Sequence, residues 1–153
     1  MRVIILAAGY DTRLYPLTEN FPKALLPVGG RLSLEWLVES LQGIGDVEEI
    51  LIVTNGIFED HFCRWLEHSV KAGNLPIRII SDGTRTESEK LGAIGDLAFA
   101  LKSQGVADDV VFAAGDQLFG SPLAGFGALA RSSRSPVIGV FDVGSPAATK
   151  EYS

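Results

Sequence analysis

The stretch Val3-Ile4-Ile5-Leu6-Ala7-Ala8-Gly9, close to the N-terminus, decides the fold. Its first five residues are apolar without a break and rich in β-branched side chains, a pattern typical of a strand that is covered on both faces. Parallel strands buried in this way occur in α/β proteins, where helices cover both faces of the sheet. The stretch therefore predicts an α/β protein whose first strand lies in the centre of the sheet.

Further strands and helices alternate along the rest of the chain. Four more apolar runs are predicted strands: Ile50–Val53, Ile77–Ile80, Val110–Ala113 and Val137–Val143. The residues between the runs show helical apolar stripes, and residues 147–153 look like the start of a further helix. The first helix has Ser33 as its predicted N-cap, and Gly43 and Gly45 lie at its end. Strands alternating with helices predict right-handed βαβ units. We expect a three-layer α/β/α sandwich, Rossmann-like, with a mostly parallel sheet.

Length and charge limit the classes of function. With 153 residues the chain is expected to form one domain with a substantial core. Its net charge of −6 argues against a nucleic acid partner, which needs clustered Lys and Arg, but a few cations can still bind a phosphorylated small molecule. The single cysteine excludes an internal disulfide, and no run approaches the roughly 20 apolar residues that span a bilayer. We expect a cytoplasmic protein without a membrane partner; homo-oligomerisation stays open.

A long segment without helical or strand periodicity, residues 8–32, follows the first strand. It is restrained by Pro16, Pro22 and Pro27, and its apolar residues would anchor it to the core. Long loops in compact domains are usually functional, and ligands of open α/β sheets bind at the carboxyl edge, where this loop begins. The segment therefore predicts a ligand site.

The residues of this loop suit a polyphosphate ligand. Gly9 permits close backbone approach, so the amides after it can bind phosphate oxygens. Arg13 supplies a planar cation and Lys23 a point charge. Asp116 follows the predicted strand Val110–Ala113 at the same sheet edge, and a carboxylate there suits a magnesium ion shared with phosphate oxygens.

Five motifs carry a resemblance to a known family. They are Leu6-Ala7-Ala8-Gly9-Tyr10-Asp11-Thr12-Arg13-Leu14, Pro16-Leu17-Thr18, Pro22-Lys23-Ala24-Leu25-Leu26-Pro27-Val28, Leu91-Gly92-Ala93-Ile94-Gly95-Asp96-Leu97 and Gly115-Asp116-Gln117-Leu118-Phe119. In this order they resemble the signature of the sugar-phosphate nucleotidyltransferases, over essentially the whole chain. Members transfer a nucleoside monophosphate from an NTP to a sugar 1-phosphate and release pyrophosphate. The resemblance implies an enzyme of nucleotide-sugar biosynthesis that uses Mg²⁺.

The resemblance also implies roles for individual residues. The implied nucleotide-binding positions are Leu6, Ala7, Ala8, Gly9, Tyr10, Asp11, Thr12, Arg13, Lys23, Glu87 and Gly92. Arg13 and Lys23 would be the catalytic cations, holding the triphosphate and the reacting phosphates, and Asp116 would hold the metal. Catalysis would then rest on positioning and electrostatic stabilisation.

Two positions depart from the family pattern. Asp11 stands where the family usually has a second glycine; aspartate tolerates positive φ, and a side chain there is expected to point outward. Its charge should still cost affinity, so we expect Asp11→Gly to tighten NTP binding. Glu87 stands where a glutamine often reads the base, which leaves the choice of base open.

Three questions remain open from the sequence. The family's later Glu-Lys-Pro motif and second acidic metal ligand are absent, so residues 1–153 are expected to be a C-terminally incomplete domain, either an N-terminal portion or a natural short form. One alternative function is a nucleotide- or sugar-nucleotide-binding module without catalysis, and another is transfer to a different acceptor such as phosphocholine. Asp82-Gly83-Thr84 is read first as a turn and, as the alternative, as a border of the pocket.

Overall fold

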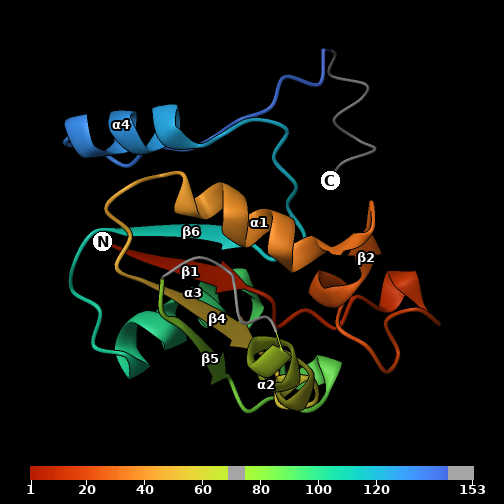
Figure 1. The fold of residues 1–153 in the computed structure, drawn as a ribbon. Helices are drawn as coiled ribbons and strands as arrows, with labels where there is room; N and C mark the ends of the chain where they lie inside the picture. Colours follow the sequence, from red (N-terminus) through yellow and green to blue (C-terminus); the bar gives the residue numbers. More distant parts are fainter. Residues whose placement is uncertain (69–74, 145–153) are drawn as a thin grey trace.

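The computed structural model describes residues 1–68 and 75–144, so the helix predicted at 147–153 lies outside the described residues. Its main sheet consists of β1 (Arg2–Leu6), β4 (Glu49–Thr54), β5 (Ile77–Ser81) and β6 (Val110–Ala114). The strand order is β5-β4-β1-β6, and all three pairings are parallel (Figure 1). β1 therefore lies inside the sheet, with Val3 paired to Ile50 and Val111. The prediction of a central first strand is confirmed.

The helices and short elements lie where the apolar stripes predict them, with one difference at a helix start. They are η1 (Thr12–Leu14), η2 (Lys23–Leu25), the antiparallel pair β2 (Pro27–Val28) and β3 (Arg31–Leu32), α1 (Ser33–Gln42), α2 (Glu59–His68), η3 (Glu87–Glu89), α3 (Gly92–Ser103) and α4 (Ala124–Ser132). Ser33 is the first residue of α1 and not its N-cap, which is Leu32. The Leu32 amide donates to the Glu35 carboxylate at 3.2 Å, whereas the Leu32 side chain cannot accept a hydrogen bond from the first amides of the helix. Among the described residues no helix is both long and apolar enough to cross a membrane.

Helices cover both faces of the sheet, which makes three layers. Val3 and Ile5 of β1 are fully buried in a cluster with side chains of α1, α2 and α4. Ile4, pointing the other way, packs in a second cluster with Ala100 of α3. Alternating side chains of one strand thus enter two cores, because successive residues of a strand point to opposite faces. The predicted three-layer α/β/α architecture with a parallel sheet is confirmed (Figure 1).

The prediction of a fifth strand at Val137–Val143 is wrong. The described residues after α4 form no strand, and Ile138, Val140 and Phe141 are 83%, 85% and 87% exposed. In Figure 1 this segment follows α4 on the far side of α1 from the sheet. A strand needs a neighbouring backbone edge for its hydrogen bonds, and the segment reaches none. An apolar run alone does not reveal whether such an edge lies within reach.

Candidate active site

The loop after β1 is fixed to the strands on both sides of it. The Ala7 amide donates to the Val53 carbonyl and the Gly115 amide donates to the Leu6 carbonyl, each at 2.8 Å. Gly115 is buried, and a Cβ there would lie 3.0 Å from the Ala7 Cβ. The glycine therefore lets the turn after β6 lie directly against the end of β1, which brings Asp116 to the first residues of the loop.

Lys23 and Asp116 form the closest charged contact of this edge. The Lys23 Nζ lies 2.6 Å from Asp116 Oδ2, although the two residues are 93 positions apart. Lys23 begins η2, whose Ala24 and Leu25 are buried and anchor the turn to the core. The backbone under Lys23 is thus fixed while the ammonium group stays partly exposed. The structure brings these two predicted site residues together as the sequence implied.

Asp11 lies beside the same pair. Its backbone is left-handed, with φ 45° and ψ 41°, as predicted, and its carbonyl accepts hydrogen bonds from Thr18 Oγ1 at 2.8 Å and the Leu14 amide at 2.9 Å. Burial raises the pKa of the Asp11 carboxyl, Lys23 opposes this rise and Asp116 adds to it.

The expectation that the Asp11 side chain points outward is wrong. A Cβ placed on Gly9 would lie 3.3 Å from Asp11 Oδ2, so the carboxylate folds back over the loop. The Asp11 side chain thus lies against Gly9, and the charges of Lys23 and Asp116 act on its pKa in opposite directions. Arg13 and Thr12 are exposed in η1, immediately after it.

Asn55 is a buried residue of this edge that the sequence analysis did not single out. Its Nδ2 donates to the Ala8 carbonyl at 3.2 Å, and its Oδ1 accepts from the amides of Ile57 and Phe58 at 3.1 and 3.0 Å. It thereby joins the loop after β1 to the turn that begins α2. The Asn55-Gly56 dipeptide after an apolar strand is a turn signal that could have identified it.

A second buried polar group links Tyr10 to the turn after β5. The Tyr10 hydroxyl lies 3.0 Å from Thr84 Oγ1, and Thr84 donates through its amide and its hydroxyl to Asp82 Oδ1 at 2.7 and 2.8 Å. Gly83 has φ 80°, and the Thr84 amide bond to Asp82 Oδ1 closes the segment Asp82-Gly83-Thr84 through a side chain and not through a backbone hydrogen bond. Asp96, on α3, is 6% exposed, and its Oδ1, like Asp82 Oδ2, is buried without a hydrogen-bond partner among the described residues. It lies within an otherwise apolar helical stretch, where nothing in the sequence shows a partner.

The two residues predicted to lie near the base, Glu87 and Gly92, lie in the segment between β5 and α3 and at the start of α3. Glu87 is exposed in η3 and forms an ion pair with Lys90 at 3.2 Å. Gly92 begins α3 with φ 73°, and a Cβ built on it meets no atom within 4 Å. The backbone at Gly92 is therefore open to a ligand from solvent, and its positive φ favours glycine.

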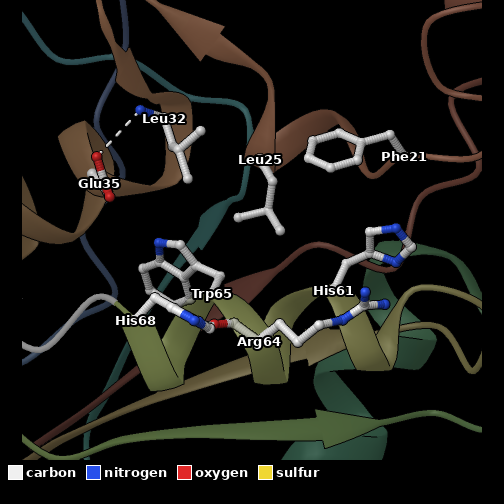
Figure 2. A pocket seen from close by; sticks show the side chains of 8 residues that line it. All are labelled: Phe21, Leu25, Leu32, Glu35, His61, Arg64, Trp65 and His68. Carbon is white, nitrogen blue, oxygen red and sulfur yellow. Dashed lines mark hydrogen bonds between the residues drawn. The ribbon is translucent and has the colours of Figure 1, made fainter.

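The structure also has a cavity of about 500 Å³ that none of the predicted site residues lines. Figure 2 shows it between η2, α1 and α2, with Phe21 and Leu25 facing His61 and Trp65 of α2. Arg13, Lys23 and Asp116 do not line it. The predicted phosphate-binding groups lie in the loop after β1 and the turn after β6, apart from this cavity.

Asp96 makes the stability of the protein depend on pH. Burial, followed by the charge of Asp82, raises its pKa from 3.8 to about 6. The folded state keeps the Asp96 carboxyl protonated to higher pH than the unfolded chain does. The protonated carboxyl therefore contributes fully to the free energy of unfolding below about pH 4, and this contribution is lost as pH rises through about 6. At 1.36 kcal/mol per pH unit, we expect at most about 3 kcal/mol of unfolding free energy to be lost relative to Asp96→Asn, which does not titrate. Urea unfolding of both proteins across this range measures the difference; a constant difference contradicts the assignment.

These features define an α/β protein with a loop-built, charged site at the carboxyl edge of its parallel sheet. A family model described as "MobA-like NTP transferase domain" matches residues 3–140, and the chain belongs to this family. A provisionally named mannose-1-phosphate guanyltransferase of Sulfolobus acidocaldarius is 37% identical over 113 residues, 74% of this chain and 29% of that protein. The choline-phosphate cytidylyltransferase of Streptococcus pneumoniae is 44% identical over 62 residues, 40% of this chain and 26% of that protein.

Solved structures agree on the fold. A provisionally named glucose-1-phosphate thymidylyltransferase of Bacillus anthracis superposes with a TM-score of 0.73 at 24% identity, over 88% of this chain and 51% of that chain. A UDP-glucose pyrophosphorylase complexed with UDP-glucose superposes with a TM-score of 0.65 at 18% identity, over 85% and 53%. The chain thus spans about half the length of these structures and 29% or less of the two sequence relatives.

Proposed function

We propose that this chain is the NTP-binding part of a sugar-phosphate nucleotidyltransferase. The reaction joins an oxygen of a sugar 1-phosphate to the α-phosphorus of an NTP, breaks the bond between the α-phosphorus and the bridging oxygen, and releases pyrophosphate. Membership of the NTP transferase family supports the reaction class, and the names of its relatives support a phosphorylated acceptor. We further propose that residues 1–153 are one incomplete domain, because the chain covers only part of each relative.

The observation that carries the proposal is the meeting of Lys23 and Asp116 at the end of β1. Their 2.6 Å ion pair brings a cation and a carboxylate together from the loop after β1 and the turn after β6. Arg13, in η1 of the same loop, is a second, exposed cation. A multiply charged phosphate ligand needs this combination, because an acidic protein must neutralise it locally.

In this proposal each residue of the loop has a separate task. The backbone from Leu6 to Gly9 lies along the base and ribose, and the amides from Tyr10 to Thr12 face the phosphates. Arg13 and Lys23 stabilise the charge that develops on the α-phosphate and on pyrophosphate. Because the protein mainly positions and neutralises the reactants, no nucleophilic side chain is required.

Magnesium fits the carboxylates of this edge. Asp116 offers the hard oxygen ligands that Mg²⁺ prefers, and its charge acts on the pKa of Asp11. Within residues 1–68 and 75–144, no group of three or more His, Cys, Asp or Glu side chains could hold a metal. Magnesium is usually held by one or two carboxylates plus substrate phosphates, so a site in which Asp116 and the NTP hold the ion is consistent with these residues. The ion would neutralise phosphate charge when bound.

The test of the function is release of pyrophosphate by the full-length protein with a panel of NTPs and acceptors. The acceptors are sugar 1-phosphates and phosphocholine, because one relative is named as a choline-phosphate cytidylyltransferase. We expect turnover with one NTP and a sugar 1-phosphate. Turnover only with phosphocholine supports the alternative acceptor, and NTP binding without turnover supports the binding module.

The charge of Asp11 gives a prediction with a defined sign. Asp11→Asn retains the side-chain size and tolerates positive φ, but removes a negative charge that faces Lys23 and Asp116. We expect the variant to bind NTP about 5-fold more tightly without magnesium, on the order of 1 kcal/mol at a high effective dielectric. With magnesium the gain should shrink, since the metal screens the carboxylate. Calorimetric titration in both conditions checks this; weaker binding only in the presence of magnesium would instead make Asp11 a metal ligand.

A further inference from the structure

The contact between Lys23 and Asp116 is imposed by the backbones that carry the two side chains. Ala24 and Gly115, which neighbour these residues in the chain, are packed together: the Ala24 Cβ lies 3.4 Å from the position of a Cβ placed on Gly115. Ala24 is 4% exposed, and the Gly115 amide donates to the Leu6 carbonyl of β1 at 2.8 Å. Neither backbone can withdraw without disturbing the core, so the ion pair can open only by rotation of its side chains.

Lys23 binds the carboxylate that the proposed function assigns to the metal. Its Nζ lies 2.6 Å from Asp116 Oδ2, and within the described part of the chain the Asp116 side chain has no other ion pair or hydrogen bond. The side chains of Lys23 and Asp116 are 34% and 43% exposed, so ions and phosphates can reach both from solvent. An ammonium group and a magnesium ion both prefer carboxylate oxygens as partners. One carboxylate therefore faces two cations that can bind it.

We propose that Lys23 and magnesium compete for Asp116, and that the phosphates of the NTP end this competition by giving the Lys23 ammonium group another partner. This inference rests on the proposed function and deepens its metal site. Two cations on one carboxylate repel each other, so Lys23 weakens the binding of magnesium to the protein alone. Phosphate oxygens form charge-assisted hydrogen bonds with an ammonium group, so a bound triphosphate draws Lys23 away from Asp116. Binding of the nucleotide and binding of the metal then favour each other by equal factors.

The first measurement is the affinity for Mn²⁺, which suits the same oxygen ligands as magnesium, determined without nucleotide from the paramagnetic resonance signal of the free ion. Lys23→Met removes the ammonium group but keeps a long side chain. Lys102→Met is the control, because it removes the same charge from an exposed position in the last turn of α3. We expect Lys23→Met to bind Mn²⁺ at least about 5-fold more tightly than the parent, the scale of a partly exposed ion pair, and Lys102→Met to stay within about 2-fold.

The second measurement follows the Lys23 ammonium group itself in proton–nitrogen NMR spectra of the lysine side chains, where its signal is identified by its absence from Lys23→Met. Ammonium protons of an ion-paired lysine exchange with water more slowly than those of a free lysine, so the ion pair keeps the signal visible. We expect saturating magnesium without nucleotide to weaken the Lys23 signal. Tripolyphosphate with a chelator present should instead move it to a new position, and the Lys102 signal should not change.

Each part of the proposal has a result that overturns it. Unchanged Mn²⁺ affinity in Lys23→Met, together with loss of binding in Asp116→Asn, overturns the competition. A Lys23 signal that persists when magnesium saturates the protein does the same, because ammonium and metal would then share the carboxylate. An unmoved signal with tripolyphosphate overturns the exchange of partners. Mn²⁺ binding that Asp116→Asn leaves unchanged, or no Mn²⁺ binding by any of these proteins, contradicts the metal site of the proposed function and this inference with it.

Discussion

Replacement of Ile5 by alanine is expected to lower the free energy of unfolding by about 3–4 kcal/mol, the upper part of the range for deleting a buried aliphatic side chain. Ile5 is fully buried in the middle of β1, which pairs with strands on both sides. Its side chain packs in the cluster shared with α1 and α2, where a rigid sheet cannot collapse into the space left behind. Urea unfolding followed by far-ultraviolet circular dichroism measures the change.

Ile138→Ala is the matched control for this experiment. The same three carbon atoms are removed, but Ile138 is 83% exposed in the segment that was expected to be a strand. We expect a change of less than about 0.5 kcal/mol, as for other exposed positions. A loss at Ile138 comparable to that at Ile5 would mean that residues 137–143 are buried in the protein, contrary to the structure.

Replacement of Arg13 by alanine is expected to weaken NTP binding or turnover by about 2 kcal/mol or more, roughly 30-fold. Arg13 is exposed two residues after Asp11 in the loop after β1, and its charge opposes the rise in the pKa of Asp11. A net charge of −6 leaves the protein dependent on a few local cations to attract a triphosphate. Calorimetry with magnesium and NTP measures the loss.

Arg134→Ala provides the control for charge alone. Arg134 is an exposed cation after α4, and it lies outside the loop that follows β1. Its removal changes the net charge equally and should leave NTP affinity within about 2-fold, because exposed charges beyond a Debye length are screened. Equal affinities of the parent and the Arg13 variant would remove Arg13 from the site.

The sequence was sufficient for the parts of the fold that depend on local pattern. The unbroken apolar run at Val3–Ala7 predicts a buried central strand, and β1 is one. The run at Val137–Val143 is also rich in β-branched residues, although it contains Gly139 and Asp142, but it has no backbone edge beside it, and an apolar run alone does not reveal that. The prediction of Ser33 as an N-cap failed for a similar reason. The N-cap is Leu32, because its position depends on where the chain passes from β3 into α1.

In the candidate site, too, some features could be predicted from the sequence, and others depend on contacts between distant residues. Lys23 and Asp116 could be predicted to meet, because loops after parallel strands share one edge of a sheet. The direction of the Asp11 side chain could not, since it depends on hydrogen bonds that Thr18 and Leu14 make to its backbone. Asn55 and Asp96 are single polar residues whose surroundings come from other elements, so only the folded chain shows that Asn55 binds the Ala8 carbonyl and that Asp96 is buried.

The central claim is that the edge formed by the loop after β1 and by Asp116 binds an NTP together with magnesium. Calorimetric titration of this chain with each NTP, with magnesium and with a chelator in its place, tests it most directly. We predict saturable binding of one NTP that weakens when magnesium is removed and weakens again in the Arg13→Ala variant. Absence of binding by every NTP in both conditions, with the chain shown to be folded by its cooperative urea transition, would contradict the account.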